Sequence, residues 1–123
     1  MIISAESEYL SGTYLMNKKI KVFTILNAGE NVTFEDRETK EDVTKLQFNV
    51  RLADTSGTEK KWRPNQKSKA SLIKLFGEDT EKYVNKKVKA MLVPFEDKYS
   101  IQIDELETED LNKPGKGSGG TLL

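Results

Sequence analysis

Apolar and polar side chains alternate with a period of two in several short segments of this chain. The clearest segment is 46–52 (LQFNVRL), where four apolar side chains share one side of an extended backbone: Leu46, Phe48, Val50 and Leu52. This pattern predicts a strand with one face in the core and the other in solvent. By the same criterion we expect further strands at 18–26, 59–63, 86–95 and 99–103.

One segment, 66–76 (QKSKASLIKLF), has the period of a helix instead. Its apolar side chains recur at helical spacing: Ala70, Leu72, Ile73 and Leu75. Asn65 or Ser68 is the expected N-cap, and Gly77 is expected to end the helix. A second helical turn is predicted directly after it, at 78–84.

The resulting order of elements is three strands, a helix and two strands. It predicts an all-β fold with one or two short helices, in which residues 18–104 form a five-stranded barrel of the OB-fold type, with the helix between strands 3 and 4. We expect the OB-fold domain to occupy residues 1–107. Residues 108–123 are expected to form a flexible acidic and glycine-rich tail, because Gly, Lys and Pro dominate there and no apolar pattern continues.

The composition excludes the commonest metal ligands and the commonest catalytic base. The chain has no Cys and no His, so the usual thiolate and imidazole ligands and the commonest general base are absent. No apolar run approaches the ~18 residues that a membrane span needs. We therefore expect a cytoplasmic protein, inside a host cell if the source is viral, that is not an enzyme and uses no cofactor, metal or membrane.

Formal net charge is zero, but the charge is distributed unevenly. Residues 1–56 carry −2, residues 57–95 carry +6 and residues 96–123 carry −4. A local cationic zone suits a phosphate backbone, although a solvated, charge-rich surface has the same composition.

Residues 60–93 also resemble a family of small OB-fold proteins common in bacteriophages and archaea. The resemblance rests on these residues: Lys61-Trp62, Pro64-Asn65, Leu72, Phe76-Gly77, Asp79-Thr80, Tyr83-Val84 and Lys86-Lys87-Val88, with Tyr14-Leu15 upstream. Asn85 stands where that family has Gly, and Asn tolerates the left-handed backbone such a position needs. The resemblance implies an OB-fold and single-stranded DNA binding.

The candidate nucleic-acid-binding residues come from the polar sides of the predicted strands and from the basic stretches beside them. They are Lys19, Lys21, Gln47, Asn49, Arg51, Lys61, Trp62, Arg63, Lys86 and Lys87. Trp62 can stack on a base or pack in the core, and the polar side chains of 46–52 can bind a strand or face water. Lys86 and Lys87 can extend a groove or only aid solubility.

These observations predict a protein that binds single-stranded nucleic acid, DNA rather than RNA, with low sequence specificity, in DNA replication, recombination or repair. The alternative is a protein–protein interaction module that uses the same OB-fold groove. The acidic stretch 104–110 (DELETED) can recruit replication proteins, compete for the cationic groove, or be an unstructured tail.

Overall fold

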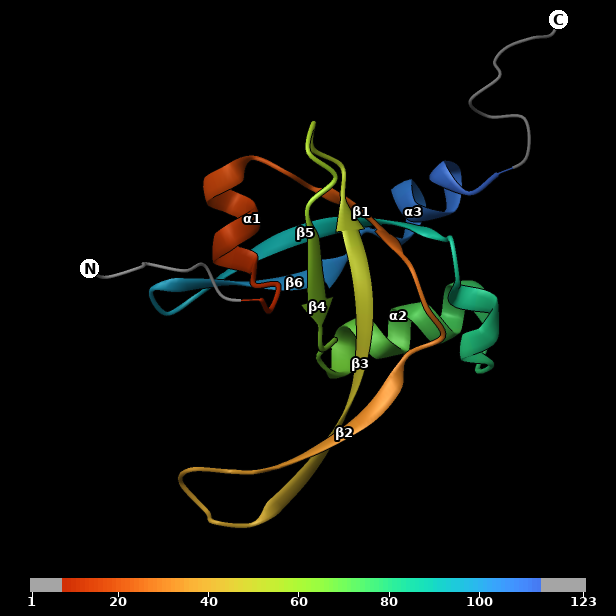
Figure 1. Ribbon diagram of the computed structural model, residues 1–123. Coiled ribbons are helices and arrows are strands. Elements are labelled where there is room, and N and C mark those ends of the chain that lie inside the picture. The colour runs from red at the N-terminus through yellow and green to blue at the C-terminus, as the bar shows by residue number, and fades with distance from the viewer. Residues whose placement is uncertain (1–7, 114–123) are drawn as a thin grey trace, which may run out of the picture.

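The computed structural model describes residues 8–113, and Figure 1 shows how the helices and strands are arranged. The elements follow in this order: α1 (Gly12–Lys18), β1 (Val22–Ile25), β2 (Glu30–Glu35), β3 (Asp42–Leu52), β4 (Glu59–Trp62), α2 (Gln66–Phe76), the 3₁₀ turn η1 (Thr80–Tyr83), β5 (Lys87–Phe95), β6 (Lys98–Ile103) and α3 (Glu105–Leu111). Mostly β structure with short helices confirms the general fold class.

The strands form one antiparallel sheet in the order β2-β3-β1-β5-β6, and β4 pairs with β3. The long strand β3 pairs with β2 along its first half and with β1 and β4 along its second half. Together, β2 and the first half of β3 project from the body of the structure (Figure 1, bottom).

The alternation of apolar positions in β3 places Phe48, Val50 and Leu52 in the core, as predicted, and each is at most 1% exposed. Phe23 of β1 lies opposite Leu52 on one side and Val88 of β5 on the other, so the buried side chains of three strands meet. The full apolar core is Leu10, Leu15, Ile20, Phe23, Ile25, Phe48, Val50, Leu52, Trp62, Leu72, Tyr83, Val88, Ala90, Ile101 and Ile103.

The predicted helix at 66–76 is confirmed as α2. Asn65 is its N-cap and accepts a hydrogen bond from the Ser68 N–H at 2.8 Å, while the Gly77 N–H closes the last turn on the Ile73 carbonyl at 2.8 Å. Asn85 has a φ of 69°, so it does adopt the left-handed conformation that the sequence pattern requires there.

The expected closed five-stranded barrel is wrong, because the sheet is open between β4 and β6. The N-terminal segment runs parallel to β4 and takes its free edge: the Leu10 N–H donates to the Lys61 carbonyl at 2.7 Å, and the Lys61 N–H donates to the Glu8 carbonyl at 2.8 Å. On the other side, the Ile101 carbonyl of β6 accepts from the Asn65 Nδ2 and Ser68 Oγ groups at the start of α2. Both edges that would have closed the barrel are therefore occupied.

The helix placement also differs from the prediction. The first predicted strand, 18–26, begins too early, because α1 extends to Lys18 and Lys19 caps it in the left-handed conformation with a φ of 59°. The structure also has a strand that was not among the five expected, β2, which follows β1 after a break at 26–29, where the Asn27 Oδ1 accepts from the Asn49 N–H at 2.9 Å. As a result α2 lies between the fourth and fifth strands.

Residues 105–111, expected to lack structure or to begin the tail, form α3 on β5. Thr108 is fully buried, and its hydroxyl accepts from the Lys89 N–H at 2.9 Å. The division expected at 107 and 108 thus falls inside a helix. The rest of the predicted tail, 114–123, lies outside the described residues.

Candidate nucleic-acid interface

One face of β3 turns away from the core. Along it Lys45, Asn49 and Arg51 are exposed, because their positions alternate with the buried ones in an extended strand. We call this surface the outer face and define it by its side chains: Tyr9, Phe34, Lys45, Gln47, Asn49, Arg51, Lys61, Arg63 and Lys87.

Cross-strand pairing brings charged side chains of neighbouring strands together on this face. Arg51 lies opposite Glu59 of β4 on one side and Thr24 of β1 on the other. Thr24 in turn lies opposite Lys87 of β5, so one row crosses four strands. In the next row Asn49 lies opposite Lys61. Four of the predicted residues are therefore neighbours in space.

Two of these cations have acidic partners, Glu59 of β4 and Glu8 of the N-terminal segment. Arg51 Nη2 is 3.5 Å from the Glu59 carboxylate, and Lys61 Nζ is 3.1 Å from that of Glu8. The hydrogen bond and charge of Glu8 raise the pKa of Lys61 above its usual range. Exposed pairs of this kind contribute little to stability, so a phosphate can replace the carboxylate at small cost.

Arg63 is the most constrained cation on the outer face. Its guanidinium carbon is 4.3 Å from the centroid of the Tyr9 ring and 4.7 Å from that of Phe34. Arg63 Nε donates to the Gln47 Oε1 at 3.0 Å, and Nη2 donates to the Tyr9 hydroxyl at 3.1 Å. This contact explains why Gln47, on an otherwise exposed side of β3, is only 6% exposed.

Trp62 belongs to the core and not to the outer face. It is 2% exposed, and its ring meets that of Phe23 edge-on, with centroids 4.9 Å apart and planes at 71°. The two residues beside it, Lys61 and Arg63, point to the opposite side of β4, as the alternation requires. Its burial removes Trp62 from the side chains that can stack on a base.

The remaining predicted lysines lie elsewhere. Lys19 and Lys21 are exposed in the segment between α1 and β1. Lys86 precedes β5 and its Nζ is 5.8 Å from the centroid of the Phe76 ring, so it faces α2 rather than the outer face.

Sequence reasoning missed three members of the outer face: Tyr9, Phe34 and Lys45. Phe34 and Lys45 share the outward parity of their strands, and the register of β2 with β3 would have revealed them. No local signal identifies Tyr9, because its position depends on the pairing of residues 8–10 with β4.

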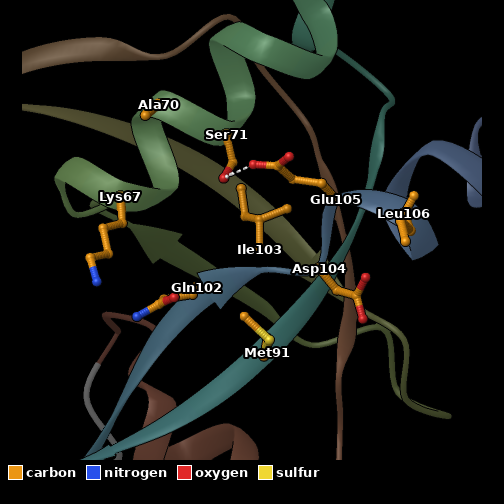
Figure 2. Close-up of a pocket in the computed structure, with 9 residues that line it drawn as sticks. All are labelled: Lys67, Ala70, Ser71, Met91, Gln102, Ile103, Asp104, Glu105 and Leu106. Carbon is orange, nitrogen blue, oxygen red and sulfur yellow. Dashed lines mark hydrogen bonds between the residues drawn. The ribbon is translucent and has the colours of Figure 1, made fainter.

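A hollow of about 540 Å³ lies between α2 and α3 above β5 and β6, away from the outer face (Figure 2). Exposed Met91 and Leu106 give it an apolar part, and Lys67 lies at the end away from Leu106. The Ser71 hydroxyl donates to the Glu105 carboxylate at 2.7 Å, and Lys74 Nζ is 3.2 Å from the same group. These two contacts lower the pKa of Glu105 and join the helices across the hollow.

Among residues 8–113, no group of three or more carboxylates is placed to hold a metal ion. Within that range no helix has the length and apolar character needed to cross a membrane. Comparison with protein-family models, curated proteins and solved structures finds no match to this chain.

Proposed function

We propose that this protein binds single-stranded nucleic acid, DNA in preference to RNA, on the outer face, with little overall dependence on sequence. The observation that carries the proposal is the gathering of cationic side chains and two aromatic rings on one side of a sheet whose other side is core. Cations neutralise the phosphate backbone, and an aromatic ring offers a stacking surface for a base of any identity.

The shape of the sheet adds support. A long β3 that pairs with β1, β2 and β4, and a helix inserted before β5, are features that an OB-fold left open at one seam would share, and OB-folds commonly bind single strands on the face of their second and third strands. A shallow hollow of about 250 Å³ lies on this side, lined by Glu8, Asn49, Glu59, Lys60 and Lys61. A role in DNA replication, recombination or repair follows from this activity, and binding involves no chemical step.

The experiment is a fluorescence-anisotropy titration with oligo-dT, oligo-rU and duplex DNA at several salt concentrations. We expect oligo-dT to bind best. The logarithm of its affinity should fall with the logarithm of salt concentration, by roughly 0.7 for each phosphate neutralised. Arg51→Ala removes one cation and should therefore reduce the slope by about 0.7. Lys82→Ala, at an exposed position on η1, removes the same charge away from the outer face and should leave binding unchanged.

A protein partner is the second candidate, favoured by Met91 at 44% and Leu106 at 80% exposure beside the hollow between α2 and α3. Binding to an apolar surface of this kind should change little with salt. Absence of oligo-dT binding at low salt would reject the nucleic-acid proposal and favour this one.

A further inference from the structure

Arg63 has a fixed orientation, which is unusual for a long cationic side chain on a sheet surface. The rings of Tyr9 and Phe34 lie 4.3 Å and 4.7 Å from its guanidinium carbon, and the hydrogen bond from Nε to Gln47 restrains the rotation of the guanidinium. Arg51, in contrast, is an exposed side chain held by one ion pair 3.5 Å long.

The contacts of Arg63 leave one edge of the guanidinium for an outside partner. Of its five N–H donors, Nε–H is used by Gln47 and one on Nη2 by the Tyr9 hydroxyl. Within the described residues, the two donors on Nη1 and the second on Nη2 have no such partner. They form a planar fork at the end of the side chain.

The two rings determine how a partner can approach. Because they lie against the guanidinium, we expect a base to meet the fork edge to edge and in its plane rather than to stack on it. Guanine presents two acceptors, O6 and N7, on one planar edge with the spacing of an arginine fork. A phosphate can also accept two hydrogen bonds from the fork, but a phosphate contact is the same for every base, so a preference for one base distinguishes the two partners.

We propose that Arg63 recognises the O6/N7 edge of a guanine, so that one position of the bound strand is base-specific while the others are not. The proposal rests on the single-strand binding proposed above. Tyr9 and Phe34 act as positioning residues for the fork, and Gln47 sets its rotation.

The test uses the unmodified protein and three oligo-dT strands that carry one central dG, one central 7-deaza-dG or one central dA. A single guanine suffices, because the strand can shift register at little cost until the guanine reaches Arg63. We expect the dG strand to bind roughly five- to hundredfold more tightly than the dA strand, the range of a good bidentate contact. The 7-deaza strand, which lacks the N7 acceptor, should lose most of that preference.

Arg63→Lys provides a second measurement, because it keeps the charge and removes the fork. It should bind oligo-dT nearly as well as the parent and lose the preference for dG, and a thermal melt checks that it folds. Equal affinity of the parent for the dG and dA strands, with oligo-dT still bound, would overturn guanine recognition and leave the proposed function standing. Failure to bind any strand would reject both.

Discussion

The carboxamide of Asn112 pairs with both backbone polar groups of Lys87: its Oδ1 accepts from the Lys87 N–H at 2.9 Å, and its Nδ2 donates to the Lys87 carbonyl at 2.8 Å. One turn earlier in the chain, the Thr108 hydroxyl accepts from the Lys89 N–H. In this part of β5 the pairing with β6 has ended, so two side chains at the end of the fold take the place of a neighbouring strand.

Substitution of either side chain should therefore destabilise the domain. Thr108→Val keeps the shape of a fully buried residue but leaves the Lys89 N–H without an acceptor, and we expect a loss of about 1–3 kcal/mol in the free energy of unfolding. Urea denaturation measures it. Glu109→Ala, at an exposed position of the same helix, is the matched control. Equal stability of the Thr108 variant and the parent would mean that α3 is not part of the cooperative unit.

Trp62→Ala should lower the free energy of unfolding by about 3–5 kcal/mol, the range for removing a large aromatic ring from a core. The ring is 2% exposed and contacts Phe23 edge-on, so its loss leaves a cavity between β1 and β4. Under conditions where the variant stays folded, oligo-dT affinity should be unchanged. A variant with parental stability and weaker binding would place the ring in a stacking role.

Phe34→Leu tests the aromatic part of the outer face, because leucine keeps an apolar side chain but removes the flat ring. Loss of base stacking is worth about 1–3 kcal/mol per base, and we expect a decrease of that size in oligo-dT affinity. The control is Phe95→Leu, since Phe95 is 63% exposed in the β5–β6 hairpin, away from the outer face. Equal losses for the two variants would show that the outer face has no special part in binding.

Gly12→Ala should be poorly tolerated although Gly12 is helical. A Cβ at this position would collide with the carbonyl oxygen of Tyr99, a backbone atom that cannot move without disturbing β6. We expect the free energy of unfolding to fall by about 1–3 kcal/mol, as it does at other overpacked sites. In Gly57→Ala, by contrast, the new Cβ would lie at an ordinary contact distance of 3.5 Å from Arg51. The only cost is the strain of an alanine in the left-handed backbone conformation, about 1–2 kcal/mol in the free energy of unfolding. Thermal melts compare the two.

Stability should fall in acid partly through Asp54, in the turn between β3 and β4. Its carboxylate accepts from the Thr58 hydroxyl at 2.7 Å and from the Thr58 N–H at 2.9 Å, and these bonds lower its pKa. A depressed pKa in the folded state stabilises the protein above the unfolded value of about 3.9, and the contribution is lost as the pH falls through the folded value. Asp54→Asn keeps an acceptor that does not titrate, so its unfolding free energy should decline less between pH 5 and pH 3 than that of the parent.

Local pattern was sufficient to predict α2 and five of the six strands, because each buries one face and repeats with the matching period, but it did not predict β2. The register of β3 also follows from alternation, and so do the outward positions of Arg51 and Arg63. Helix α1 was not predicted, because its cap and its first residue, Ser11 and Gly12, are equally typical of a turn.

The open seam and the outer face were less predictable for a different reason. The seam depends on residues 8–10 binding to β4, and the contacts of Arg63 with Tyr9 and Phe34 bring together three parts of the chain. Neither the seam nor these contacts produce a periodic pattern in the sequence. The sequence did identify Arg63, Gln47 and Lys61 individually, but from position in a strand and not from their partners.

The pairing of residues 8–10 with β4 has a consequence for the order of folding. The bridge between Tyr9 and Lys61 joins positions that are far apart in the chain, so it requires closure of a long loop and contributes to a high contact order. During synthesis residues 8–10 leave the ribosome before β4 does, so they have no strand to pair with until β4 has followed. Until residues 8–10 have docked, the edge of β4 is a site where another chain can add, and the speed of this docking sets how long that edge is open to aggregation.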